Sequence, residues 1–249
     1  MRKSQLIYQY IREQGAVSKQ DIVIGLGLSL PTITQNLNNL AELGLIDTSK
    51  KISNTGGRNA TAYSYIEKAR YAVGLYLNRH HINCVAVDLS GNVISLIRVR
   101  ENFDLNDDNY LRKIGETVEE VKKDTGLPDD RFLGVGIAVQ GLISDDGERV
   151  TYGLTLNFTG VTRADIAKYI PYHNRLFHDS AAAGYAEVWD RNDLDDAFYL
   201  SLSNSVGGAV IVANKIFEGE RRKSGEIGHM TIIPKAGDRC YCGQRGCFD

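Results

Sequence analysis

The chain has 249 residues, of which 43% are hydrophobic and 24% charged, and its formal net charge is −2. These values argue against intrinsic disorder, and the length suffices for two compact domains. Because no apolar run approaches the ~20 residues of a membrane span and the N-terminal MRKSQLIYQYIREQG is too polar for a signal peptide, we expect a cytoplasmic protein with no membrane partner.

The charge is unevenly distributed along the chain. Residues 1–68 carry eight basic and five acidic side chains, whereas residues 69–249 carry 21 and 26. A mildly basic N-terminal segment indicates an anionic partner, although this surplus alone is weak evidence for nucleic acid.

Three helices are predicted before residue 44. Apolar residues at helical spacing predict the first, which ends at Gly15, and Ser18 with Asp21 can cap the second. The third begins at the N-cap Ser29 and ends at Leu43; opposite its apolar stripe lies a face of amides and hydroxyls. Such groups can contact base edges and phosphates in the major groove of DNA. We expect these contacts from Ser29, Pro31, Thr32, Gln35 and Asn38.

Two short β-prone segments follow, on either side of a glycine-containing turn. Three helices followed by such a hairpin predict a winged helix-turn-helix with residues 29–43 as its recognition helix. Lys50, Lys51 and Arg58 are candidates for phosphate or minor-groove contact. The alternative is a small helical domain whose polar face is merely solvated, which requires all these features to coincide by accident.

From residue 67 onward the pattern changes. Three consecutive strands are predicted between residues 71 and 100, then a helix over 107–125 and an apolar strand over 132–139, with further strands and helices after them. A β-meander followed by alternating strands and helices is typical of an α/β domain with a mixed sheet. We therefore divide the chain into domains 1–66 and 67–249.

Three predicted strands end in residues suited to ligand binding. Strand 132–139 is followed by QGLIS, strand 175–178 by Asp179, and strand 197–203 by SNSVGG. Ligands of open α/β sheets lie at the carboxyl ends of strands, so these turns should line one cleft. Asp179 could act as a base, accept a hydrogen bond from a hydroxyl, or merely cap a helix. SNSVGG could bind phosphate through its N–H groups or form an ordinary hairpin turn.

Three of the four cysteines lie within eight residues at the end of the sequence. Cys240, Cys242 and Cys247 are interleaved with glycines that allow a tight backbone around a centre. Structural zinc takes four tetrahedral ligands, and His229 is the natural fourth. In a reducing compartment we expect structural Zn²⁺ here, with a redox pair or buried unreactive thiols as alternatives.

GEIGHM followed by CYCGQRGCFD resembles the signature of the ROK family, which comprises repressors, open reading frames and sugar kinases. The family pattern is E-x-G-H, then C-x-C-G-x-x-G-C-x-E. The N-terminal winged helix is similar to the repressor branch of xylose and N-acetylglucosamine regulators. The resemblance implies an actin-like, sugar-kinase-like α/β fold after the winged helix. It also implies C-terminal truncation with an incomplete second lobe, because family members continue well beyond the cysteines.

The resemblance further implies the sugar contacts, position by position. Asp179 keeps the aspartate of a family Asn-Asp pair, whereas His178 replaces its asparagine. Asp249 stands where the cysteine motif usually ends in glutamate. The implied sugar-binding residues are Asn157, Asp179, Glu226, His229 and Asp249.

The phosphate loop of the family's kinases has no counterpart at the matching place. That loop resembles D-x-G-G-T, whereas residues 74–83 read GLYLNRHHIN, and SNSVGG lacks the usual G-T-G of the second loop. We therefore expect no enzymatic activity and no catalytic residue, with Asp179 as a vestigial base position. The alternative is an ATP-dependent sugar kinase of the ROK family.

The sequence thus predicts a DNA-binding transcriptional repressor of carbohydrate metabolism genes. A homodimer or higher homo-oligomer would present its winged helices to a double-stranded DNA operator. A sugar or sugar phosphate in the cleft would favour an arrangement with unsuitable helix spacing. A third hypothesis is a sugar-independent regulator that uses the larger domain only for dimerisation.

Overall fold

The computed structural model divides into two compact units, Met1–Arg70 and Tyr71–Asp249, which we describe separately. Among the described residues, no helix has the length and apolar character needed to cross a bilayer. The structure describes residues 3–52, 60–189, 191, 194–203, 205–235 and 237–249.

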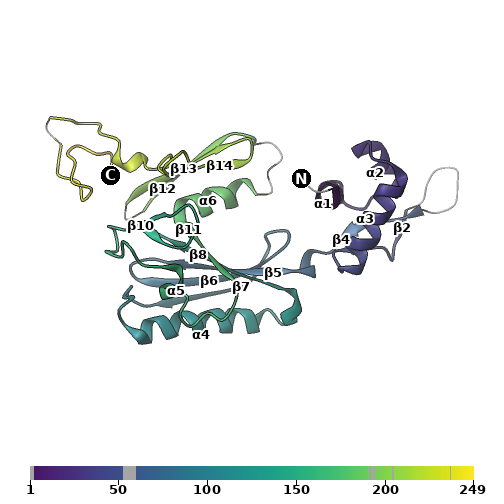
Figure 1. The fold of residues 1–249 in the computed structure, drawn as a ribbon, viewed down its shortest axis with the longest axis horizontal. Helices are drawn as coiled ribbons and strands as arrows, with labels where there is room; N and C mark the ends of the chain where they lie inside the picture. The colour runs from purple at the N-terminus through teal and green to yellow at the C-terminus, as the bar shows by residue number, and fades with distance from the viewer. Residues whose placement is uncertain (1–2, 53–59, 190, 192–193, 204, 236) are drawn as a thin grey trace. The chain divides into compact units, whose positions relative to one another are not determined.

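The first unit contains three helices and two pairs of short antiparallel strands (Figure 1). Its core is formed by Ile7 and Ile11 of the first helix, Ile22 of the second, and Ile33 and Leu37 of the third, all at most 1% exposed. The elements are α1 (Lys3–Gln14), α2 (Lys19–Leu26), α3 (Leu30–Glu42), β1 (Ile46–Asp47) paired with β4 (Ser64–Tyr65), β2 (Lys51–Ile52) paired with β3 (Ala60–Thr61), and the 3₁₀ turn η1 (Glu67–Ala69).

The helix caps follow local chemistry. Ser18 and Asp21 form the reciprocal box at the start of α2: the Asp21 N–H donates to Ser18 Oγ at 3.2 Å, and the Ser18 N–H donates to Asp21 Oδ2 at 2.8 Å. Ser29 occupies the N-cap position of α3, but its side chain makes no capping bond. Its hydroxyl pairs instead with the Thr32 hydroxyl at 2.9 Å, so Ser29 is the N-cap residue by its position and not through a side-chain bond.

The second unit is built on a five-stranded mixed sheet of order β11-β8-β5-β6-β7. Its first three strands in sequence form an antiparallel meander, and the other two run parallel to the first. The strands are β5 (Tyr71–Leu77), β6 (His81–Asp88), β7 (Val93–Arg100), β8 (Phe132–Val139) and β11 (Asn174–His178).

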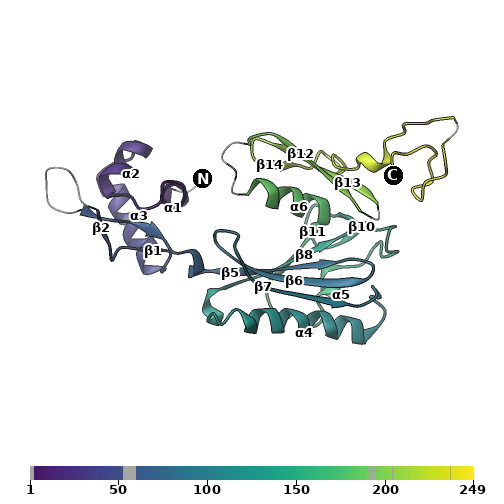
Figure 2. The same ribbon diagram turned by 180° about the vertical axis from the view of Figure 1, so that it is seen from behind.

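A second, three-stranded sheet follows, and α6 lies between the two sheets, whereas α4 covers the opposite face of the larger one (Figures 1 and 2). The remaining elements are α4 (Asp108–Asp124), η2 (Asp129–Arg131), β9 (Leu142–Ile143) paired with β10 (Val150–Tyr152), α5 (Arg163–Ile166), α6 (Asp179–Val188), β12 (Ala197–Leu202), β13 (Val206–Val212), β14 (Lys215–Phe217) and η3 (Ile227–His229).

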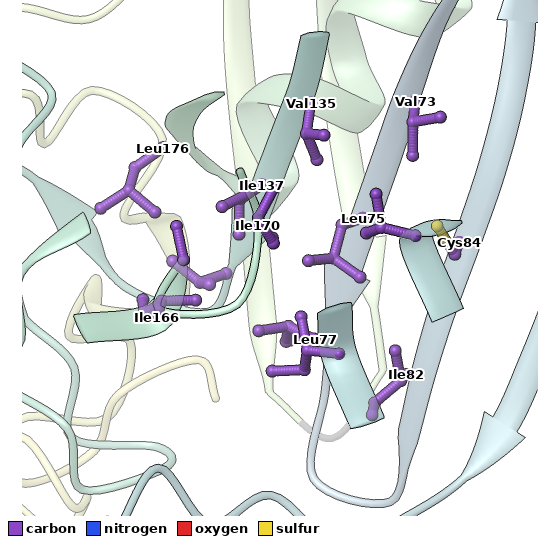
Figure 3. Close-up of a cluster of buried hydrophobic side chains, with 14 of the residues drawn as sticks. Val73, Leu75, Leu77, Ile82, Cys84, Val135, Ile137, Ile166, Ile170 and Leu176 are labelled. Carbon is purple, nitrogen blue, oxygen red and sulfur yellow. The ribbon is translucent and has the colours of Figure 1, made fainter. Parts of the chain in front are cut away.

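Successive side chains of a strand point to opposite faces of the sheet, so one set enters the core and the other faces the opposite side. In β5 every second residue is buried, and Val73, Leu75 and Leu77 belong to the cluster that Figure 3 shows. The intervening Gly74 and Tyr76 face the other side of the sheet because successive side chains of a strand point to opposite faces. Cys84 is fully buried in the same core, and burial raises the pKa of its thiol to about 12.

Candidate functional site

The carboxyl ends of three parallel strands are in register and define one wall of a pocket. Leu77 of β5 pairs with Val139 of β8, and Val139 pairs with His178 of β11. The residues that follow two of these strands, Gln140 and Asp179, are thereby placed side by side. Strand ends in this register are the usual ligand position of α/β sheets, as expected from the sequence.

The pocket is open to solvent. The β12–β13 turn contributes Ser203 and Ser205, and η3 contributes His229 with the preceding Glu226. Asn204, in the middle of that turn, lies outside the described residues. The turns that follow three separately predicted strands therefore meet at a single cavity.

Acidic and imidazole groups alternate along the pocket. His178 Nε2 lies 3.6 Å from Asp179 Oδ1 and 3.8 Å from Glu226 Oε1. On its other side, Glu226 Oε2 lies 3.9 Å from His229 Nε2. Asp179 is also the first residue of α6, and its Oδ1 accepts a hydrogen bond from the Ser180 N–H at 2.7 Å. Asp179 thus belongs to a helix N-terminus and to the pocket at the same time.

The structure brings three of the five implied sugar-binding residues, Asp179, Glu226 and His229, to the pocket wall. Asn157 and Asp249 are not among the described side chains that line it. Asn157 adopts a left-handed backbone (φ 55°) in the turn after β10, and the carboxylate of Asp249 accepts a hydrogen bond from the Val206 N–H.

A His/Cys₃ cluster lies directly behind this wall. One potential ligand atom from each of His229, Cys240, Cys242 and Cys247 lies within 4.8 Å of all the others. The Sγ atoms of Cys242 and Cys247 are 3.7 Å apart, and Cys240 Sγ is 3.6 Å from His229 Nδ1. Tetrahedral zinc with ordinary bond lengths separates two sulfur ligands by about 3.8 Å and sulfur from nitrogen by about 3.6 Å. The donor set and its spacing are therefore compatible with structural zinc.

His229 links the cluster to the pocket. Its Nδ1 faces Cys240, while its Nε2 faces Glu226. The Tyr241 ring packs edge-on against the imidazole with 5.1 Å between ring centroids. Burial, opposed by a hydrogen bond with Thr155, raises the pKa of Tyr241 to about 12, so this phenol is neutral at physiological pH. Because His229 belongs to both, a displacement of the His/Cys₃ cluster would also move a side chain of the pocket wall.

Gln140, Tyr152, Thr155 and Tyr241 also line the pocket. Gln140 begins the QGLIS turn that was expected at the cleft from the sequence, although no role was assigned to it, and the other three were not singled out. The other three come from irregular segments or hairpins whose positions depend on the tertiary fold, so their local sequence carries no comparable signal.

The turn between β5 and β6 contains residues 78–80, part of the segment whose sequence was compared with the phosphate loop of the family's kinases. Asn78 Oδ1 accepts hydrogen bonds from the N–H groups of His80 at 3.1 Å and His81 at 2.9 Å. The Arg79 guanidinium donates to the Thr155 carbonyl at 2.6 Å. Two backbone amides of this turn are thus engaged by a side chain of the turn itself.

The face of α3 that was predicted to read DNA is accessible. Pro31, Gln35 and Asn38 are exposed and lie on one side of the helix, given their i, i+4, i+7 spacing. Ser29 is exposed at the start of the helix, and Thr32 is half-buried. In the segment that follows, Lys50 and Lys51, the first residue of β2, are exposed, whereas Arg58 lies outside the described residues.

Comparison with known proteins places the chain in a family. Residues 72–249 match the ROK family, and the chain belongs to it. It is 26% identical to the xylose repressor of Bacillus subtilis (strain 168), over 98% of this chain and 64% of the relative. It is 24% identical to the transcriptional dual regulator NagC of Escherichia coli (strain K12), over 99% of this chain and 61% of the relative. The chain therefore spans less than two thirds of the length of these relatives.

Solved structures show the same fold. A ROK family transcriptional regulator, described as a homolog of the E. coli MLC protein, superposes with a TM-score of 0.79 and 22% identity over 98% of this chain and 62% of that chain. The ROK hexokinase of Thermus thermophilus gives a TM-score of 0.57 and 24% identity over 71% of this chain and 58% of that chain. The second unit thus has the actin-like ROK fold of mixed α/β content, which regulators and kinases share.

Proposed function

We propose that this chain belongs to a DNA-binding transcriptional repressor of carbohydrate metabolism genes, whose cleft binds a sugar or sugar phosphate without phosphoryl transfer. The observation that carries the proposal is the extent of the similarity. Repressors align with 98–99% of this chain, including its N-terminal unit, whereas the hexokinase aligns with 71%.

We assign DNA binding to residues 1–66, as a winged helix-turn-helix with α3 as the recognition helix. The exposed amide and hydroxyl groups of α3 and the absence of acidic residues from its first turn support this assignment. Residues 67–249 form the sugar-binding domain in this proposal. The DNA contacts would come from Ser29, Pro31, Thr32, Gln35, Asn38, Lys50, Lys51 and Arg58.

The proposed cofactor is structural Zn²⁺ held by His229, Cys240, Cys242 and Cys247. Four soft or borderline protein donors fill a tetrahedral shell, which leaves no position for substrate or water chemistry. The metal would fix the loop that carries Tyr241 and would orient the His229 imidazole toward Glu226. Its role would be to hold the pocket wall in place.

The proposed sugar contacts are Asp179, Glu226 and His229 in the pocket, together with the family positions Asn157 and Asp249. Asp179 would accept a hydrogen bond from a sugar hydroxyl in the position where a kinase has its base. The N–H groups of His80 and His81 already donate to the Asn78 carboxamide, so they are not free to bind the phosphates of ATP. This supports sugar binding without ATP. A ROK sugar kinase remains the alternative because kinases share the fold and Asp179 lines the pocket.

In the proposed mechanism a homodimer or higher oligomer holds two recognition helices at operator spacing, and sugar binding shifts the population toward a different spacing. Selection of bound sequences from a random double-stranded DNA library, followed by titration of the bound DNA with sugars, tests the function. We expect enrichment of a two-fold symmetric site and its loss from Gln35→Ala/Asn38→Ala. ADP release with a sugar and ATP would favour the kinase, and DNA binding that no sugar changes would favour the sugar-independent regulator.

A further inference from the structure

One polar side chain of the pocket has an unused bonding group. Gln140 lines the pocket beside Asp179, and its Nε2 donates to Tyr76 Oη at 3.3 Å. Its Oε1 is buried and has no hydrogen-bond partner within the described part of the chain. Buried polar atoms of proteins are nearly always paired, so an unpaired carbonyl oxygen at a pocket wall indicates a donor supplied by a ligand.

Tyr76 determines which end of the Gln140 amide faces the pocket. The β5–β8 register pairs Tyr76 with Ala138, which brings the phenol within reach of Gln140. Burial, then the negative charge of Asp179, raises the pKa of Tyr76 to about 12, and a hydrogen bond to Asp179 adds to the shift. The phenol therefore keeps its proton at neutral pH. Its oxygen accepts the hydrogen bond from Gln140 Nε2, which leaves the amide carbonyl as the free end of the side chain.

Carboxylates line the same pocket as the Gln140 carbonyl. Asp179 and Glu226 contribute carboxylates, and the Nε2 of His178 lies between them. A ligand phosphate at this position would meet two negative charges and a carbonyl oxygen, which all repel it. A hydroxyl group can donate to each of these acceptors without charge repulsion.

We propose that Gln140 is a specificity-determining residue whose side-chain oxygen accepts a hydrogen bond from a hydroxyl group of an uncharged sugar. The inference rests on the proposed sugar-binding function and narrows its ligand class from sugars and sugar phosphates to unphosphorylated sugars. Tyr76 is a positioning residue that fixes the amide and does not itself contact the sugar.

Isothermal titration calorimetry on the full chain tests the assignment with D-glucose, D-xylose, N-acetyl-D-glucosamine and glucose 6-phosphate as probes. Gln140→Leu should weaken binding of the preferred uncharged sugar about ten-fold, the equivalent of about one hydrogen bond. One monodeoxy analogue of that sugar should bind the wild type about ten-fold more weakly than the parent sugar does. The same analogue should bind Gln140→Leu as well as the parent sugar does, because the two changes remove the same contact.

The variant Tyr76→Phe tests the positioning role separately. It should weaken sugar binding by a smaller factor, and the double variant Tyr76→Phe/Gln140→Leu should bind no more weakly than Gln140→Leu alone. Gln9→Leu on the surface of α1 and Tyr110→Phe in the core of the second unit are matched controls that should leave sugar affinity unchanged.

Equal sugar affinities of the wild type and Gln140→Leu, with unchanged thermal unfolding, would overturn the inference and leave the proposed function standing. Tighter binding of glucose 6-phosphate than of glucose would also overturn it. If Gln140→Leu does not fold, the test rests on Tyr76→Phe. Equal sugar affinities of Tyr76→Phe and the wild type would then contradict the inference. A wild type that binds none of the sugars contradicts both the inference and the proposed function.

Discussion

At the scale of single residues, the pocket departs at His178 from the Asn-Asp pair that the sequence resemblance implies. An imidazole there faces two carboxylates, Asp179 and Glu226, whereas an asparagine would offer one donor and one acceptor to a ligand. The aspartate beside it is retained and lies at the first position of α6. Ligand selectivity should therefore differ from that of relatives with asparagine at this position, while the placement of the acid is preserved.

The zinc proposal makes a prediction for the cysteines. Cys240→Ser combined with Cys242→Ser removes two of the four ligands, so zinc content and the response of DNA binding to sugar should be lost together. Elemental analysis of the purified protein measures the zinc content, and a DNA-binding titration with and without sugar measures the response. Cys84→Ala is the control, because Cys84 is buried in the core away from the cluster and the variant should keep its zinc. Full sugar response in zinc-free protein would contradict the structural role of the metal.

A second residue-scale prediction concerns Asn78. Asn78→Ala removes the oxygen that accepts from two backbone N–H groups of the β5–β6 turn. The free energy of unfolding should fall by about 1 kcal/mol, as for the loss of an ordinary intramolecular hydrogen bond. Urea denaturation measures the change, with Asn106→Ala as an asparagine-to-alanine control in another loop. A stability equal to that of the wild type would show that these bonds do not hold the turn.

At the scale of elements, the features that could be predicted from the sequence are those formed by residues close together in the chain. The reciprocal cap of α2 is present because Ser18 and Asp21 are three residues apart. The metal cluster was predictable because three of its ligands share one short segment. The Tyr76–Gln140 contact was not predictable, since it depends on the parallel register of β5 and β8. The position of Asn157 outside the pocket lining follows from a turn whose course the sequence does not reveal.

The loop of residues 240–247, which carries the three cysteines, requires glycine at one of its turns. Gly246 has φ +70°, and a Cβ there would collide with the Ile233 carbonyl, whereas at Gly243 (φ +92°) a Cβ would meet no described atom within 4 Å. Gly246→Ala should therefore abolish zinc binding, and Gly243→Ala should only weaken it through backbone strain of about 1 kcal/mol. Zinc competition with a chromogenic chelator measures both. Equal zinc affinities of the two variants would count against the tight packing of this loop.

The start of α4 predicts a pH dependence. A hydrogen bond from Lys168, joined by one from Tyr169, lowers the pKa of Asp108 from 3.8 to about 2. Because the folded-state pKa is depressed, this contribution to stability is complete above pH 4 and is lost as the pH falls through about 2. Asp108→Asn should therefore lose less stability than the wild type on going from pH 5 to pH 2. Thermal unfolding scans across this range measure the difference, and parallel curves for the two proteins would refute it.

At the scale of the whole molecule, sequence reasoning identified the family, and the family match over residues 72–249 bears this out. The fold cannot separate repressor from kinase, because structures of both classes superpose on the second unit. In our proposal two features favour the repressor: the polar side chains on α3, and a β5–β6 turn in which Asn78 bonds two backbone amides. Both features are consistent with a protein that senses sugar and binds DNA.

Sugar-controlled DNA binding is the central claim, and one measurement tests it most directly. Fluorescence anisotropy of a labelled operator, obtained by selection from random DNA, would be followed with the wild type while an uncharged sugar is added without ATP. We expect the sugar to raise the apparent dissociation constant for DNA at least ten-fold, with no effect of the same sugar on Asp179→Ala. Operator binding that is identical with and without every sugar tested would contradict the claim.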